Sequence, residues 1–380
     1  MGSKEYKIVY CTPALYFAGG MERVLTMKAN YFAEHFGYDI TLILTEGESK
    51  PPFYPLSDKV KVVNLNIGFE ELWACSFVKK IIIYLRKQHL YKKRLEDELM
   101  RIRPDITVSM LRREINFITK IKDGSKKVGE IHINRANFRN FESKNFIKEL
   151  FAKLWMSNLT KKLKRLDRFI VLTEKDMESW VDLDNVCVIP NPLSFVPLNI
   201  SKLTEKRVIA VGRYCHEKGY DLLLKAWCIV QNSIVDWRLE VFGEGDRSQY
   251  EEMISFLNID RQRCILHGRS SNIQDEFEKS SLSVCSSKFE GFGLVITEAM
   301  ACGLPVVSFD CPWGPRAIID DGEDGLLVEN GNVEKLADAI IWMIQHPEMR
   351  NKMAARAIEN VQRFRIEKIA EKWRSLFDSL

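Results

Sequence analysis

The chain has 380 residues, of which 46% are hydrophobic and 28% charged, so it is long enough for two α/β domains and is not disordered. Its net charge of +4 is unevenly shared: residues 1–195 carry 33 basic and 24 acidic side chains, whereas residues 196–380 carry 23 and 28. A basic first half favours an anionic surface partner, and the lack of an aromatic–basic recognition module argues against nucleic acid.

The first half alternates strands and helices from its beginning. Residues 7–11 predict a strand, residues 12–20 a loop that ends in Gly19-Gly20, and the residues after it a helix. This order is typical of a Rossmann-type domain, although the G-x-G-x-x-G pattern of dinucleotide-binding proteins is absent. Further strands are predicted over residues 40–44, 60–65, 106–110, 127–132, 168–173 and 186–189.

One histidine stands at the end of a predicted strand. The strand over residues 127–132 closes with Glu130-Ile131-His132. Ligands of doubly wound sheets bind at the carboxyl ends of the strands, so His132 is a candidate site residue. The alternative is a loop histidine whose hydrogen bonds are satisfied locally.

Two stretches of the first half combine apolar residues at helical spacing with a polar face of Lys and Arg. They cover residues 69–94 and 146–168. Helices of this composition lie on anionic bilayer surfaces. The alternative is an amphipathic helix that packs on the sheet and leaves a solvated basic face. Because two such stretches occur in the basic half, contact with an anionic membrane surface is one hypothesis and the packed helix is the other.

The second half begins a new series of strands and helices. A strand over residues 208–211 is followed by Gly212-Arg213 and, after four residues, by Lys218-Gly219, with a helix beyond. Two cations on one strand–helix loop can neutralise a diphosphate, so Arg213 and Lys218 are candidate phosphate ligands. The alternative is a pair of solvated loop cations. Later strands cover residues 238–242 and 264–267.

The most informative stretch, from residue 286 to residue 307, reads S-S-K-F-E-G-F-G-L-V-I-T-E-A-M-A-C-G-L-P-V-V. It predicts a glycine-bearing loop, a helix over residues 294–301 and a strand. The helix N-terminus beside Gly293 suits a phosphate. Glu290 and Glu298 flank this anion site and would repel a phosphate alone, so the ligand is expected to bring hydroxyl groups as well. Phosphates together with hydroxyls describe a nucleotide sugar.

Glu290 and Glu298, with seven residues between them in this stretch, resemble the donor motif of retaining glycosyltransferases of family 4, which have the GT-B fold. The resemblance spans most of the chain; it is strong from about residue 190 to 345 and sparse between 50 and 165. It implies two Rossmann-like doubly wound domains facing across a cleft. The implied division is an acceptor-binding domain over residues 1–192, a nucleotide-sugar-binding domain over residues 193–360, and a helix over residues 361–380 that crosses back to the first domain.

The resemblance also implies roles for individual residues. The Gly-Gly-Met-Glu loop approaches the donor phosphates and the acceptor, and backbone groups at Gly268-Arg269 contact the base. Catalytic roles are implied for Glu290, His132, Arg213 and Lys218. Donor-binding roles are implied for Gly19, Gly20, Arg213, Lys218, Gly268, Arg269, Gly291, Phe292, Gly293, Leu294 and Glu298.

The implied reaction is a retaining transfer of a hexose from a nucleotide sugar, with UDP-hexose favoured. The acceptor would be a saccharide or lipid-linked saccharide in the synthesis of a cell-surface polysaccharide such as a capsule. No metal or other cofactor is expected, because fixed cations occupy the phosphate clamp, and Asp182-Leu183-Asp184 is interpreted as a surface turn. Two alternatives stay open: a non-catalytic nucleotide-sugar-binding subunit and a sugar-nucleotide epimerase of GT-B type.

Location is inferred from the apolar runs and the cysteines. No apolar run reaches the ~18 residues that a membrane span needs, and the beginning of the chain lacks a signal-peptide pattern. The nine cysteines include no Cys-x-x-Cys pair, which is typical of small buried side chains in a reducing compartment. The sequence therefore predicts a cytoplasmic protein, with the inner face of the cytoplasmic membrane as the site of any membrane contact.

Overall fold

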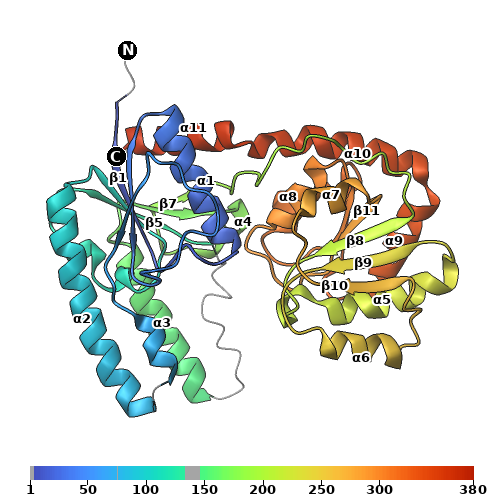
Figure 1. The fold of residues 1–380 in the computed structure, drawn as a ribbon, viewed down its shortest axis with the longest axis horizontal. Helices are drawn as coiled ribbons and strands as arrows, with labels where there is room; N and C mark the ends of the chain where they lie inside the picture. Colours follow the sequence, from blue (N-terminus) through green and yellow to red (C-terminus); the bar gives the residue numbers. More distant parts are fainter. Residues whose placement is uncertain (1–3, 75, 133–145) are drawn as a thin grey trace. The chain divides into compact units, whose positions relative to one another are not determined.

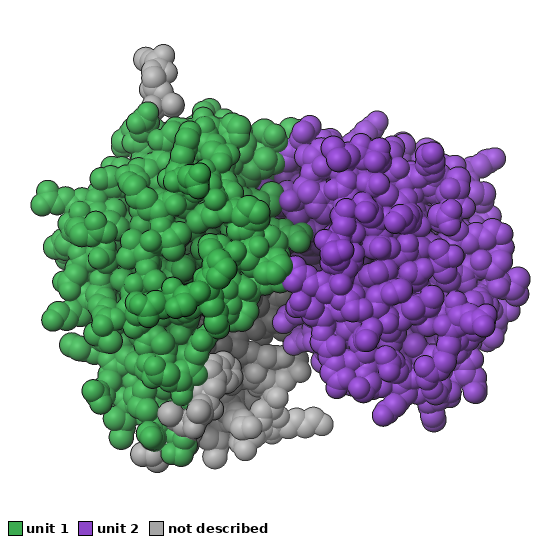
Figure 2. All heavy atoms as spheres, in the orientation of Figure 1, with its two compact units in different colours: residues 1–190, 366–380 green, residues 191–365 purple. Residues whose placement is uncertain are grey.

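The computed structural model describes residues 4–74, 76–132 and 146–380, and the chain divides into two compact units (Figure 1, Figure 2). Unit 1 comprises residues 1–190 and 366–380, and unit 2 comprises residues 191–365. Each unit is built on a sheet whose paired strands all run parallel, with seven strands in unit 1 and six in unit 2. The predicted α/β class with two doubly wound sheets is confirmed.

The sheet of unit 1 has the strand order β3-β2-β1-β4-β5-β6-β7. Strand order reverses between β1 and β4, which are neighbours although two strands separate them in the sequence. The strands are β1 (Lys7–Thr12), β2 (Asp39–Leu44), β3 (Lys61–Asn64), β4 (Ile106–Ser109), β5 (Lys126–Glu130), β6 (Arg168–Val171) and β7 (Val186–Val188). The helices are α1 (Gly20–His35), α2 (Phe77–Ile102), α3 (Phe146–Leu163), α4 (Glu174–Ser179) and α11 (Ile366–Asp378), with short 3₁₀ turns η1 (Phe69–Ala74), η2 (Glu114–Asn116) and η3 (Ile118–Lys120).

Both faces of this sheet are covered, which is why successive residues of β1 are buried rather than alternate ones. Ile8 and Tyr10 of β1 belong to a core built with α1 and α11, whereas Val9 and Cys11 belong to a core built with α2 and α3. The C-terminal helix α11 contributes Trp373, which is 1% exposed, to the first of these cores. The end of the chain is therefore a structural part of unit 1.

Residues 69–94 do not form the single amphipathic helix that their spacing suggested. Residues 69–74 form the turn η1, and α2 begins at Phe77 and continues to Ile102. The second half of α2 packs into the core through Tyr91, Leu95 and Leu99. The first half instead exposes apolar side chains, with Ile82 57% and Leu85 61% exposed.

The sheet of unit 2 has the order β10-β9-β8-β11-β12-β13, with a reversal between β8 and β11. Its strands are β8 (Arg207–Val211), β9 (Arg238–Phe242), β10 (Cys264–His267), β11 (Leu282–Cys285), β12 (Val306–Phe309) and β13 (Gly325–Val328). The helices are α5 (Tyr220–Ser233), α6 (Ser248–Phe256), α7 (Ile273–Glu278), α8 (Leu294–Ala301), α9 (Val333–Gln345) and α10 (Pro347–Val361), with 3₁₀ turns η4 (His216–Lys218), η5 (Pro315–Ala317) and η6 (Gln362–Phe364). Side chains of β8 and β9 form a continuous core with α5, α6 and α9 on one face.

Candidate functional site

The loops that follow the strands of unit 2 all lie at one edge of its sheet, because the strands are parallel. Ligands of such sheets bind outside the carboxyl ends of the strands, where the strand order reverses. In unit 2 that point lies between β8 and β11. The loop after β8 carries Lys218, and the loop after β11 carries Glu290.

Lys218 and Glu290 form an ion pair at this point. Lys218 Nζ donates to Glu290 Oε1 over 2.5 Å, and Ser287 Oγ donates to the same oxygen over 2.7 Å. Burial lowers the pKa of Lys218, but the neighbouring charges, above all that of Glu290, more than offset burial and raise this pKa to about 12. Lys218 is therefore a fixed cation, and the two side chains stay 22% and 13% exposed.

A close backbone contact brings the two loops together. Gly219 has φ +62°, and a Cβ at this position would lie 2.1 Å from the carbonyl oxygen of Ser286. Ser286 Oγ in turn donates to the carbonyl oxygen of Lys218 over 2.9 Å. Only glycine adopts this backbone conformation at such a short approach without strain. The position of Lys218 opposite Glu290 thus depends on the residue that follows it.

The helix α8 continues from the loop that carries Glu290. Its N-cap is Gly293, and its first backbone N–H groups have no acceptor within the helix, so they offer an anion site. The helix ends as the sequence predicted: Gly303 has φ +76°, and the N–H of Leu304 donates to the carbonyl of Ala299 over 3.0 Å. Glu298, in the second turn, is 5% exposed.

The other residues proposed from the sequence for donor binding occupy the same edge. Gly291 and Leu294 are partly exposed, whereas Phe292 is buried and contacts the ring of Phe364 edge-on at 5.3 Å between centroids. Arg213 is exposed on the loop between β8 and η4.

The base-contacting loop expected at Gly268-Arg269 follows β10. Arg269 Nη1 lies 3.1 Å from Glu244 Oε1, and the N–H of Gly243 donates to the carbonyl of Gly268 over 3.3 Å. Both contacts join this loop to the loop after β9. The structure therefore aligns the loops after β8, β9, β10 and β11 along one edge.

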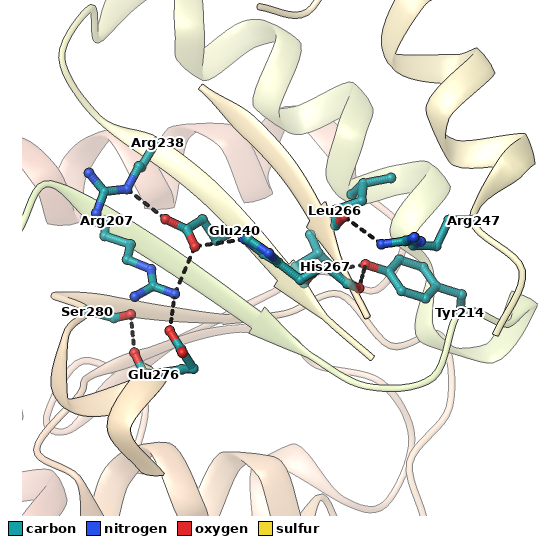
Figure 3. Close-up of polar contacts among 10 residues, drawn as sticks. Arg207, Tyr214, Arg238, Glu240, Arg247, Leu266, His267, Glu276 and Ser280 are labelled. Carbon is teal, nitrogen blue, oxygen red and sulfur yellow. Dashed lines mark hydrogen bonds and ion pairs between the residues drawn. The ribbon is translucent and has the colours of Figure 1, made fainter. Parts of the chain in front are cut away.

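A buried polar network under this edge was missed from the sequence (Figure 3). Glu240 of β9 lies 2.9 Å from Arg207 Nη2 of β8 and 2.9 Å from His267 Nε2 of β10, and Arg238 Nε donates to its other oxygen over 2.7 Å. Arg207 Nη2 also donates to Glu276 of α7 over 2.7 Å. The network ties three strands together and reaches the residue before Gly268 through His267. Its one sequence signal is an acidic residue between Leu239 and Val241 in an apolar strand.

In unit 1 the loop after β1 ends at Gly19, the N-cap of α1, and Gly20 is the first residue of that helix. A Cβ at Gly19 would lie 2.1 Å from Glu22 Oε2, so the carboxylate of Glu22 folds back over the helix start. This loop lies beside the reversal between β1 and β4. Gly19 and Gly20 thus occupy in unit 1 a position like that of Gly219 in unit 2.

His132 is the second residue after β5, and its side chain is 9% exposed. Its Nε2 lies 3.0 Å from Glu130 Oε1, the oxygen that also accepts a hydrogen bond from Lys28 of α1. The alternative from the sequence was a loop histidine with locally satisfied hydrogen bonds; His132 Nε2 is instead buried without a well-aligned hydrogen bond among the described residues, beside the carboxylate of Glu130. Sequence reasoning missed Lys28, because a lysine on a helix is normally assigned to its exposed face.

Two further sequence features concern metals and membranes. Asp182 and Asp184 lie exposed in the turn between α4 and β7. Across the described ranges no three His, Cys, Asp or Glu side chains form a group that could hold a metal ion. Among the helices described, none is both long and apolar enough to cross a membrane.

The sequence of the second unit decides the family. Residues 198–360 match the family described as glycosyl transferases group 1. This chain contains a group 1 glycosyltransferase domain. It is 27% identical to an uncharacterized glycosyltransferase of Haemophilus influenzae over 94% of this chain and 96% of that protein. It is 25% identical to the amylovoran biosynthesis glycosyltransferase AmsD of Erwinia amylovora over 98% of this chain and 100% of that protein.

Other relatives match over part of their length. The poly(ribitol-phosphate) alpha-N-acetylglucosaminyltransferase of Staphylococcus aureus is 31% identical over 67% of this glycosyltransferase and 51% of its own chain. Solved structures share the fold at low identity. A complex of S. aureus TarM with UDP, fondaparinux and alpha-GlcNAc-glycerol has a TM-score of 0.76 at 18% identity, covering 98% of this chain and 100% of that one. Anabaena HepE in complex with UDP and glucose has a TM-score of 0.73 at 17% identity, covering 99% and 100%.

The contact at Gly219 predicts a large effect of a single methyl group. Gly219→Ala is expected to reduce the free energy of unfolding by about 3 kcal/mol or more, because the Cβ meets the backbone of Ser286. Gly322→Ala is the matched control: Gly322 has φ +78° and open space within 4 Å, so it should lose only the backbone term of about 1–2 kcal/mol. Urea unfolding of both variants measures the difference, and equal losses would contradict the close contact.

Proposed function

We propose that this glycosyltransferase moves a hexose from UDP-hexose to a saccharide or lipid-linked saccharide acceptor, with retention of configuration at the anomeric carbon. The observation that carries the proposal is the Lys218–Glu290 pair at the strand-order reversal of unit 2, next to the N-terminus of α8. One cation and one helix terminus suit a diphosphate, and one carboxylate suits a sugar hydroxyl. Structures of the same fold with UDP, and with UDP and glucose, support the choice of donor.

Each residue has a role in this proposal. Lys218 and Arg213, together with the N–H groups beside Gly293, stabilise the departing diphosphate. Glu290 accepts a hydrogen bond from a hydroxyl of the transferring sugar, and Glu298 accepts from the ribose. Lys218 has three N–H donors and uses one on Glu290, so it can hold the acid and a phosphate oxygen together.

The remaining donor contacts follow the order of the loops. Gly268 and Arg269 receive the base through backbone groups, and Gly291, Phe292 and Leu294 line the start of the phosphate site. Gly19 and Gly20 approach the phosphates from unit 1. His132 acts beside the transferring sugar, as the family resemblance implies.

The proposed transfer needs no covalent enzyme intermediate. The bond from the anomeric carbon to the β-phosphate oxygen breaks, and a bond from that carbon to the acceptor oxygen forms on the same face. The proton of the acceptor hydroxyl passes to the leaving phosphate oxygen. The role in making a cell-surface polysaccharide is supported by the relative that acts in amylovoran biosynthesis.

The decisive experiment incubates the protein with a panel of nucleotide hexoses, with and without saccharide acceptors, and measures release of the nucleotide and the anomeric configuration of the product by NMR. Transfer with retention supports the proposal. Interconversion of the donor without acceptor would show an epimerase, and thermal stabilisation by a donor without turnover would show a binding subunit.

Loss of either member of the pair should abolish transfer without unfolding the protein. Lys218→Ala and Glu290→Ala are each expected to lower kcat at least ~100-fold, because each removes a charged contact made in the transition state. Lys225→Ala and Glu252→Ala, at exposed positions of α5 and α6, are the matched controls and should keep the parent rate. Variants of the pair that stay within tenfold of the parent would overturn their assigned roles.

We also propose that transfer is independent of metal ions, since fixed cations balance the charge of the diphosphate. Treatment with EDTA is expected to leave the rate of transfer unchanged within about twofold, because Lys218 and Arg213 supply the stabilisation that a bound Mg²⁺ would otherwise provide. A rate that disappears in EDTA and returns with added Mg²⁺ would contradict this.

The proposal includes a cytoplasmic location at the inner face of the membrane. In the first half of α2, Ile81, Ile82 and Leu85 are 46%, 57% and 61% exposed, and Lys80 and other exposed basic residues flank them. A helix packed only for stability would bury these apolar side chains, as α2 does farther along at Leu95. Exposed apolar residues beside basic ones match an anionic lipid surface.

Flotation with vesicles tests this surface. The parent is expected to float with phosphatidylglycerol vesicles at low salt and to stay behind with neutral phosphatidylcholine vesicles. Ile82→Glu/Leu85→Glu should abolish flotation, whereas Val235→Glu/Phe256→Glu, at apolar residues of unit 2 that are 77% and 84% exposed, should not. A parent that fails to float at low salt would remove the membrane from the proposal.

A further inference from the structure

A charged pair is enclosed in the face of the unit 1 sheet that packs against α1 and α11. Lys28 and Glu130 are 1% and 2% exposed, and His132 beside them is 9% exposed. The surrounding core is apolar and includes Leu25, Ala29 and Met110 among its members. A lysine and a glutamate are rarely buried this completely.

The geometry of the cluster centres on one carboxylate oxygen. Glu130 Oε1 accepts a hydrogen bond from Lys28 Nζ and lies 3.0 Å from His132 Nε2. Within the described part of the chain, Glu130 Oε2 and His132 Nε2 are buried without a well-aligned hydrogen bond. The His132 ring is thus positioned by its contact with the Glu130 carboxylate, and that carboxylate is positioned by the Lys28 ammonium group.

Aromatic rings close the other sides of the ammonium group. Lys28 Nζ lies 4.3 Å from the ring centroid of Trp373 in α11 and 5.7 Å from that of Tyr10 in β1. The faces of aromatic rings attract cations, most strongly when water is excluded. The C-terminal helix therefore covers the charged pair.

The buried ion pair stabilises the fold little compared with apolar residues at the same positions. Removing a buried ion pair from water costs several kcal/mol per ion, and apolar residues of similar volume often stabilise a protein as well or better. Burial raises the pKa of Glu130, but Lys28 and His132 more than offset it and lower this pKa to about 2. Burial lowers the pKa of Lys28, and Glu130 offsets only part of that effect. A reason other than packing is needed for two charges at this place.

We propose that Lys28 and Glu130 are positioning residues, which hold the ring of His132 in one orientation at the carboxyl end of β5. Glu130 orients the ring, and Lys28 holds the carboxylate of Glu130 in place and offsets its charge. The described titratable groups of the cluster are Glu130 of β5, which contacts the ring, and Lys28 of α1 and Tyr10 of β1, which lie beside Glu130 and each other. The role of His132 in transfer rests on the proposed function, whereas the geometry of the cluster does not.

Titration of the histidine ring tests the geometry without any donor or acceptor. The protein is labelled with ¹⁵N-histidine, and the His132 signal is identified by its loss in His132→Gln. In Lys28→Met the uncompensated carboxylate stabilises the imidazolium, so the ring should protonate at higher pH than in the parent. In Glu130→Gln the unpaired ammonium disfavours the imidazolium, so the ring should protonate at lower pH.

Kinetics test the consequence for transfer. Glu130→Gln and Lys28→Met are each expected to lower kcat about 100-fold while the KM for the donor stays within about twofold, because the donor-binding residues of unit 2 are untouched. The pH at which the rate falls on acidification should move as the ring titration does. Lys61→Met, which removes a pair with Asp39 that is 64% and 37% exposed, is the control and should change neither the rate nor the titration.

A double variant separates positioning from stability. Lys28→Met/Glu130→Leu replaces the pair with apolar residues and is expected to fold with an unchanged or higher melting temperature, yet to keep the hundredfold loss of kcat. A folded double variant within about threefold of the parent rate, or a ring titration equal in all variants, would overturn the inference. If the parent transfers no sugar from any donor while the ring titration shifts as expected, the proposed function fails and the positioning stands.

Discussion

The ion pair between Lys218 and Glu290 joins two loops that are 72 residues apart in the sequence. It exists because β8 and β11 are neighbours in a parallel sheet, so the loops that follow them leave the same edge. Gly219 then allows the backbone of one loop to contact the backbone of the other at Ser286. Cation, carboxylate and helix terminus are brought together by strand order and by one glycine.

Each unit places a lysine beside a glutamate, but the two pairs differ in their exposure to solvent. In unit 2, Lys218 and Glu290 are partly exposed, so each keeps donors or acceptors that a ligand can use. In unit 1, Lys28 and Glu130 are fully enclosed, so neither can reach a ligand and both act only on what they touch. The partly exposed pair of unit 2 can therefore bind a ligand, whereas the enclosed pair of unit 1 can only orient the side chains that it touches.

The chemistry of the edge also ranks the alternatives. In the proposed transfer, Lys218 attracts the diphosphate and Glu290 repels it, so that Glu290 holds the sugar apart from its leaving group. A binding subunit would need complementarity to the nucleotide, but not this opposition of charges. The buried Glu240 network supports the loop at Gly268 in either case, so it does not distinguish them.

Much of unit 2 could be predicted from the sequence because its signals are local. Apolar runs marked the strands and Gly303 marked the end of α8, since each depends on residues close in the chain. The glycine loop between β11 and α8 predicted a phosphate site for the same reason. The contacts of Lys28, Glu130 and His132 could not be predicted, because they join a helix to a strand about a hundred residues later, and a lysine on a helix has no local signal of burial. The exposure of Ile82 and Leu85 could not be predicted either. Helical spacing shows that a helix is amphipathic, but only the packed structure shows which part of its apolar face contacts a core. The sequence by itself determined two parallel α/β units and predicted which residues form a nucleotide-sugar site; the tertiary structure alone decided which charges face each other, because pairing depends on strand order and enclosure rather than on neighbours in the chain.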